Sequence, residues 1–165
     1  LGSRGRECGP SLGLPSPVPP VEQPDWPAYC CAFIRDGAGR FLLERRPPRT
    51  PGAPRLLTCF GGTREAGERP DECIRRELHE ELRWGPCFIV ALDLRVHLVL
   101  RSPRREVAWF YRSSPIDAAA PIVCEPGYEP VWVAPEDLPT APLSGWHAVV
   151  FSAYLRGEAL ARIDE

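Results

Sequence analysis

The stretch that decides the fold covers residues 61–84 and reads GGTREAGERPDECIRRELHEELRW. In its second half, apolar residues recur at every fourth position, which predicts an amphipathic helix packed on a core. These residues are Ile74, Leu78 and Leu82. A second face of the same helix carries glutamates three and four positions apart. They are Glu77, Glu80 and Glu81. Pro70-Asp71, which suits a first helical turn, predicts where the helix begins.

The glutamate face of this helix predicts a metal site. Carboxylates held close together repel one another unless a cation lies among them. Hard divalent cations such as Mg²⁺ and Mn²⁺ prefer oxygen ligands, and Mg²⁺ is usually shared between carboxylates, water and substrate phosphates. A solvated, salt-bridged helix face is the alternative interpretation of a run such as RRELHEEL. The spacing of the neighbouring residues favours the metal site.

That spacing resembles the box motif of the Nudix hydrolase family, to which MutT belongs. The pattern is G, five residues, E, seven residues, R-E-U, one residue, E-E, one residue and G-U, where U is a bulky apolar residue. The matching positions are Gly62, Glu68, Arg76, Glu77, Leu78, Glu80, Glu81 and Trp84. A strand candidate at residues 56–60 leads into the motif, as its context requires.

One position departs from the pattern, because Arg83 stands where the family has glycine. At the end of a helix a left-handed backbone costs little for glycine and more for arginine. Gly85-Pro86 follows two residues later. We therefore expect the helix end to be displaced or reshaped, and the metal face upstream to be unaffected.

The resemblance implies an α/β fold, the Nudix α/β/α sandwich with a mixed β-sheet. It also implies metal-dependent hydrolysis of a nucleoside diphosphate linked to another moiety, with Mg²⁺ or Mn²⁺ as the cofactor. The residues that it assigns to the metal are Glu77, Glu80 and Glu81, with Glu68 as an auxiliary ligand and a carbonyl of Gly61 or Gly62 as a further oxygen. Arg76 is interpreted as the partner that orients the carboxylates, since a guanidinium suits bidentate pairing.

Two assignments of the general base remain: Glu80, or a carboxylate outside the helix. The family often takes this residue from a loop downstream of the box, so Glu125 and Glu129 are preferred to Glu106. Two histidines outside the box, His97 in an expected strand and His147 in the expected last helix, are interpreted as structural residues.

The substrate also stays open. The proline expected for ADP-ribose hydrolases and the tyrosine expected for dinucleoside polyphosphate hydrolases are absent near residues 99–100. Nucleoside triphosphates, oxidised nucleotides and nucleotide sugars remain as candidates. The alternative from another class is a Nudix domain that binds a nucleotide as a sensor or interaction module without cleaving it. The complete set of box glutamates favours an enzyme.

Composition excludes several other classes. The net charge of −2 shows no basic excess for binding a nucleic acid polymer. Seven cysteines without a CxxC pair suggest neither a disulfide framework nor a zinc site. No segment reaches the roughly 18 apolar residues of a membrane span. We therefore expect a cytoplasmic protein that binds a small nucleotide-type molecule and no membrane.

The chain is expected to contain a proline-rich N-terminal arm at residues 1–27 and one Nudix domain at residues 28–165. Seven prolines favour extended backbone in the arm, which we expect to pack along the body or across a neighbouring subunit of a homodimer.

Within the domain, the expected strands are residues 29–35, 40–45, 56–60, 87–100, 106–112 and 128–134. Residues 46–55 form a proline-rich loop with several arginines, either solvated or facing a phosphate. Ser144 is expected to cap a last helix that ends at Gly157. The predicted buried face of that helix is Trp146, Val149, Val150, Ala153 and Tyr154.

Overall fold

The computed structural model describes residues 25–83 and 91–164. The arm predicted at residues 1–27, and its proposed contact with a neighbouring subunit, lie almost entirely outside this part. The strands are β1 (Tyr29–Arg35), β2 (Phe41–Arg45), β3 (Leu57–Thr58), β4 (Phe60–Thr63), β5 (Leu92–Leu100), β6 (Arg105–Ser113), β7 (Glu129–Val133) and β8 (Leu160–Ile163). The helices are α1 (Pro70–Leu82), the 3₁₀ helix η1 (Pro135–Thr140) and α2 (Gly145–Leu155). None of these helices is long and apolar enough to cross a membrane.

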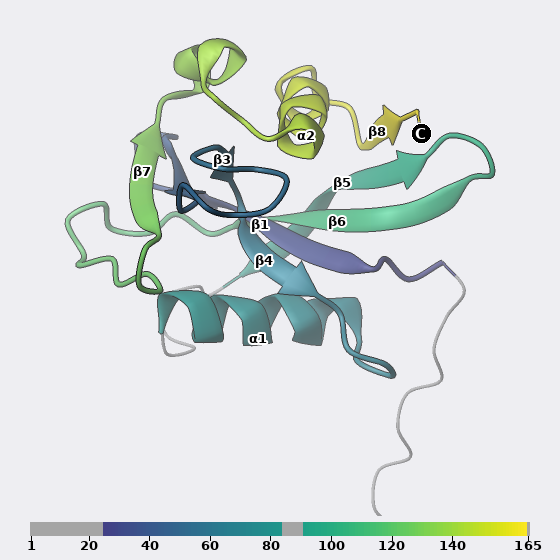
Figure 1. The fold of residues 1–165 in the computed structure, drawn as a ribbon, viewed down its shortest axis with the longest axis horizontal. Coiled ribbons are helices and arrows are strands. Elements are labelled where there is room, and N and C mark those ends of the chain that lie inside the picture. Colours follow the sequence, from purple (N-terminus) through teal and green to yellow (C-terminus); the bar gives the residue numbers. More distant parts are fainter. Residues whose placement is uncertain (1–24, 84–90, 165) are drawn as a thin grey trace, which may run out of the picture.

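The strands form a mixed sheet between two helical layers, with α1 on one face and α2 on the other (Figure 1). The sheet runs in the order β3-β2-β1-β6-β5-β8, while β4 pairs with β1 and β7 pairs with β2. Two pairs are parallel, β1 with β6 and β5 with β8, and the other pairs are antiparallel. The predicted α/β/α sandwich with a mixed sheet is confirmed.

Alternating residues of the central strands divide the core into two halves, because successive side chains of a strand point to opposite faces. In β1, Ala32 and Ile34 pack toward α1, whereas Phe33 packs toward α2. In β2, Leu42 belongs to the α1 half, and Phe41 and Leu43 belong to the α2 half. Both halves are buried, as expected for a sheet covered on both faces.

Strand β1 changes its neighbour on one edge, and this change positions the functional residues. Its first half, Tyr29–Ala32, pairs with β4, and its last two residues pair with β2. The other edge pairs with β6. Strands β2 and β4 therefore diverge from β1 in different directions, so side chains from both can face a common space between them.

Helix α1 has the buried face that its sequence predicts. Ile74, Leu78 and Leu82 are buried against β1 and β4. Pro70 occupies the start of the helix, and Asp71 and Glu72 lie in the first turn, where negative charge is favourable. The burial of three large side chains fixes which face of α1 is turned away from the core.

The glycines before α1 differ from the prediction. The predicted strand ended at residue 60, but Gly61 and Gly62 belong to strand β4 and pair with Cys31 and Cys30 of β1. Gly61 has φ +141°, and a Cβ atom there would lie 2.1 Å from the Cys30 carbonyl oxygen. Only glycine permits this close approach of the two strands.

The end of α1 also differs from the prediction, because it is not displaced. The helix ends at Leu82, and Arg83 itself adopts the left-handed conformation with φ +50°. The arginine therefore takes the backbone geometry that usually favours glycine. Trp84 and Gly85-Pro86, on which the expected displacement depended, lie outside the described residues.

Helix α2 begins after Ser144 and is followed by Gly157 at φ +73°, as predicted. Its predicted buried face is confirmed for Val150 and Ala153, and Tyr154 is partly buried against the core, but the prediction is wrong for two residues. Trp146 and Val149 are among the exposed large apolar residues, and the buried residues are His147, Val150, Phe151 and Ala153. The helix is apolar on nearly all sides, so periodicity alone could not select its buried face.

The conformation of Arg83 generates a prediction about stability. Replacing Arg83 by glycine should raise the free energy of unfolding by about 1 kcal/mol, because a left-handed backbone is costly for residues with a Cβ atom. Urea denaturation would measure the change. Arg75→Gly is the matched control: it removes an arginine from the exposed interior of the same helix, and should lower stability by about 1 kcal/mol. A loss of stability in Arg83→Gly would contradict the prediction.

Candidate functional site

The guanidinium of Arg76 lies among three of the predicted carboxylates. Its Nε and Nη2 donate to the two oxygens of Glu68 at 2.7 and 3.0 Å. Its Nη1 donates to Glu77 at 2.8 Å and to Glu80 at 3.3 Å. Nη2 also donates to the carbonyl of Thr63 in β4 at 3.0 Å. The arginine therefore ties the helix to the preceding strand and loop, as expected for an orienting residue.

The predicted ligand Glu77 lies directly against the backbone of β4. A Cβ atom at Gly62 would lie 2.5 Å from the Glu77 carboxylate. The missing side chain at this position thus leaves room for a carboxylate beside the strand. This cradle brings the oxygens of Glu77 next to the Gly61-Gly62 backbone, where the sequence predicts them.

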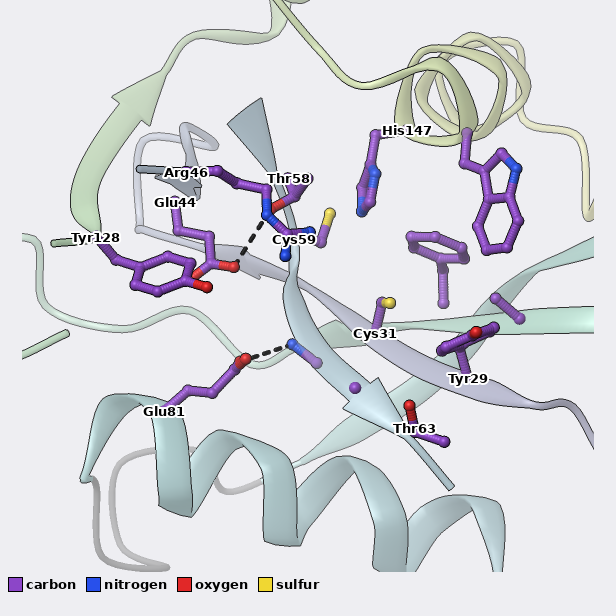
Figure 2. A pocket seen from close by; sticks show the side chains of 15 residues that line it. Tyr29, Cys31, Glu44, Arg46, Thr58, Cys59, Thr63, Glu81, Tyr128 and His147 are labelled. Carbon is purple, nitrogen blue, oxygen red and sulfur yellow. Dashed lines mark hydrogen bonds between the residues drawn. The ribbon is translucent and has the colours of Figure 1, made fainter. Parts of the chain in front are cut away.

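Glu81 points toward β4 from the last turn of α1 (Figure 2). Its carboxylate accepts a hydrogen bond from the Gly61 amide at 2.8 Å. Burial raises the pKa of Glu81 to about 8, and the nearby charge of Glu44 adds to this shift. The pKa of Glu68 moves in the other direction, to about 2, because the hydrogen bonds from Arg76 favour its ionised form.

A cavity of about 370 Å³ lies beside Glu81, between the diverging strands and the start of α2. Figure 2 shows Glu44 and Arg46 at the end of β2 on one side of this cavity, Tyr29 on the other, and His147 descending from α2 between them. Its volume falls within the range of ordinary small-molecule pockets, about 300–1,000 Å³. We call this space the β2–β4 cavity.

Glu44 is the main residue of the site that sequence reasoning missed. Its side chain is only 7% exposed and accepts a hydrogen bond from Thr58 Oγ1 at 3.3 Å. Burial raises its pKa to about 7. The available signal was a glutamate that directly follows the apolar residues 41–43 in an expected strand, since carboxylates are rarely buried without a reason.

The three downstream candidates for the general base occupy different places. The charge of Glu125 adds to the raised pKa of both Glu81 and Glu44. Glu129 pairs with Arg45 at 3.3 Å. Glu106 accepts a hydrogen bond from the Trp109 indole at 3.0 Å and lies 3.3 Å from His97.

The site therefore brings together the box glutamates and Glu44. Their oxygen donors and the cradle at Gly62 fit a hard divalent cation. In the arrangement described here the guanidinium of Arg76 takes the central position. Accordingly, within residues 25–83 and 91–164 no three acidic, histidine or cysteine side chains converge tightly enough to hold an ion. Metal binding requires these carboxylates to share their oxygens between Arg76 and the ion.

Comparisons with known proteins agree with this architecture. The chain resembles the MutT protein from Methanosarcina mazei Go1, at 22% sequence identity and a TM-score of 0.64, over 78% of this chain and 91% of that chain. It resembles a MutT NUDIX hydrolase from Burkholderia pseudomallei at 23% identity and a TM-score of 0.59, over 79% and 98% of the two chains. It also resembles the Nudix hydrolase RenU from M. smegmatis at 20% identity and a TM-score of 0.56, over 79% and 84%.

A search of curated proteins gave no match. The family model described as the NUDIX domain, in contrast, matches residues 25–154, which include the whole carboxylate helix, the glycine strand and the cavity. This match covers most of the chain and extends well beyond the box motif. The chain therefore belongs to the Nudix family and is a hydrolase that acts on pyrophosphate bonds.

Proposed function

We propose that this hydrolase cleaves a nucleoside diphosphate linked to another moiety, and that the reaction depends on Mg²⁺ or Mn²⁺. The observation that carries the proposal is the position of the box glutamate Glu81, beside Glu44, at one end of a cavity whose other end is aromatic and apolar. A substrate with a charged pyrophosphate and an attached apolar ring matches these two ends. The complete set of box glutamates also argues against a module that only binds nucleotides.

The metal would be held by Glu77, Glu80 and Glu81, with Glu68 as an auxiliary ligand and a carbonyl of Gly61 or Gly62 as a further donor. When bound, such an ion neutralises phosphate charge and lowers the pKa of an attacking water. Glu77 and Glu81 are pre-positioned for this role by the β4 backbone. Arg76 keeps Glu68 ionised and restrains the neighbouring carboxylates.

Two further residues have roles that follow from their positions. We propose Glu125 as the downstream residue that accepts a proton from water, because its charge acts on both Glu81 and Glu44, with Glu80 as the alternative on the helix. Arg46 lines the cavity, and its Nε is buried without a hydrogen-bond partner among the described residues. We assign Arg46 to a phosphate oxygen of the substrate, because a guanidinium with a buried, unsatisfied donor favours an anionic partner.

Replacing Glu81 by glutamine tests the proposed metal site. We expect turnover to fall by about 10²–10³-fold, since the variant loses an anionic ligand that supports metal-ion catalysis. Phosphate release should be measured with Mg²⁺ or Mn²⁺ across nucleoside triphosphates, oxidised nucleotides, ADP-ribose and nucleotide sugars. The wild-type activity should disappear in EDTA. Melting temperature would confirm that the variant remains folded.

Glu136→Gln is the control for this variant, because Glu136 is an exposed glutamate of η1 away from the carboxylate helix. It should retain wild-type turnover. Activity that persists in EDTA, or equal activity in Glu81→Gln and the wild type, would contradict the proposed metal site.

The raised pKa values of Glu81 and Glu44 predict a pH dependence of the metal-free protein. Both groups hold a proton in the folded state, up to a pKa of about 8 for Glu81 and about 7 for Glu44, whereas the ordinary value is 4.5. Their stabilising contribution is therefore complete below about pH 4.5 and is lost as the pH rises toward 8.

Melting temperatures of the wild type and of Glu44→Gln/Glu81→Gln, measured in EDTA between pH 5 and 9, isolate this contribution. The double variant should gain stability relative to the wild type as the pH rises. Added Mg²⁺ should stabilise the wild type more at pH 8.5 than at pH 6, because only ionised carboxylates bind it. A constant difference between the two proteins across this range would refute the assignment.

A further inference from the structure

His147 presents a buried polar atom to the β2–β4 cavity. Its side chain is 9% exposed, and its Nε2 has no hydrogen-bond partner among the residues that the structure describes. It descends from α2 toward Cys31, with Arg46 on one side and Tyr29 on the other (Figure 2). Buried polar groups are almost always hydrogen-bonded, so an unpaired one that faces a cavity requires an explanation.

The other ring nitrogen of His147, Nδ1, has a hydrogen-bond partner. Ser144, the N-cap residue of α2, places its hydroxyl 2.6 Å from His147 Nδ1. The hydroxyl makes no capping bond to the helix backbone. Because it can donate or accept, it fixes the ring orientation while allowing either nitrogen to carry the proton. Burial lowers the pKa of His147 to about 4, and the charge of Arg46 adds to this shift, so the ring is neutral near pH 7.

The cavity around His147 is aromatic. Phe110 meets the imidazole edge to face, with ring centres 5.6 Å apart. Tyr29 and Trp146 form a second edge-to-face pair at 5.7 Å and remain 38% and 37% exposed, which leaves their rings accessible beside the cavity. Large aromatic side chains are seldom left exposed in pairs beside a cavity without a ligand to cover them.

A purely structural role explains these features less well. A histidine that only filled the core would bury two polar nitrogens and satisfy one of them, and an apolar side chain would avoid this cost. Arg46 Nε, in the same cavity, is also buried without a partner among the described residues. Two unsatisfied polar atoms from different elements thus line one space.

We propose that His147 binds the edge of the substrate's nucleobase, with the base enclosed by the aromatic residues of the β2–β4 cavity. Ser144 is the positioning residue that orients the imidazole. This inference rests on the proposed function, because it assigns the non-phosphate part of the substrate to the end of the cavity opposite the box glutamates. His147 would then determine which bases the enzyme accepts.

The composition of the cavity favours a base over a sugar at this position. A nucleobase offers flat faces for aromatic contact and an edge that forms hydrogen bonds. A sugar carries several hydroxyl groups, and each would need a polar partner when buried. Besides Arg46, the lining residues on this side of the cavity include Phe110, Ala108, Cys31 and the Tyr29–Trp146 pair, which supply mainly apolar surface.

Ring nitrogen signals of the full-length protein test this inference without requiring catalysis. The chain contains three histidines, so the ¹⁵N resonances of each ring can be assigned. Adenosine, guanosine, cytidine and uridine are titrated in the absence of metal, and inorganic tripolyphosphate is titrated separately with Mg²⁺. At least one nucleoside should shift His147 Nε2 and leave His97 unchanged. Tripolyphosphate, which has no base, should not shift His147 Nε2.

Substitutions then measure the contribution of the imidazole. His147→Leu should weaken binding of the responsive nucleoside by about tenfold, the equivalent of one buried hydrogen bond. Its affinity for tripolyphosphate with Mg²⁺ should stay within about twofold of the wild-type value. Ser144→Ala should change the tautomer ratio of His147 and weaken nucleoside binding less than His147→Leu does. His97→Leu, which removes a histidine outside the cavity, is the matched control.

Nucleoside binding with no shift at His147, equal nucleoside affinity in His147→Leu and the wild type, or no nucleoside binding at millimolar concentration would each overturn the inference. If His147→Leu does not fold, the wild-type titration and Ser144→Ala still decide the question. Failure of the proposed function is distinguishable, since it would appear as absent metal-dependent hydrolysis while nucleoside binding is measured without metal.

Discussion

The ion pairs of Arg76 are the interaction on which the geometry of this site depends. A single guanidinium bridges a loop glutamate, two helix glutamates and the carbonyl of Thr63 in β4. Without it, several carboxylates would repel one another across a small volume, and the loop before α1 would lose its attachment to the helix. The planar guanidinium of arginine has five donors and can make these bonds at once. A lysine ammonium cannot match their geometry. The same arrangement keeps the acidic face assembled in the metal-free protein.

The second requirement is the change of neighbour along β1. Since β4 pairs with its first half and β2 with its end, the two strands separate and leave a cavity between them. Glu44 comes from one side of this separation and the Gly61 amide, which holds Glu81, from the other. Residues distant in sequence are thereby collected beside the acidic helix. Small side chains are essential at this point, as the contact between Gly61 and Cys30 shows.

Sequence patterns predicted the helix, the family and the order of most strands, because these depend on local spacing. The buried face Ile74, Leu78 and Leu82 is a direct result of helical periodicity. The patterns failed where contacts between distant parts of the chain determine which residues are buried or which strands form. Helix α2 is apolar on most sides, so its burial depends on what packs against it, and β8 is a short strand that exists only through pairing with β5. Glu44 was missed because no motif links it to the box.

Strand β8 also covers part of the outer edge of the sheet. It lies beyond residue 154, where the family match ends, and runs parallel to β5 along His97–Leu100. The other side of β5 pairs with β6, so β8 is the element that covers the outer edge of this long strand. An uncovered edge presents free amide and carbonyl groups to other chains. A chain shortened after α2 would retain the carboxylate helix and the cavity, yet expose a surface suited to intermolecular strand pairing. The four residues of β8 thus cover the edge of β5 at His97–Leu100, although they lie outside the carboxylate helix and the cavity lining.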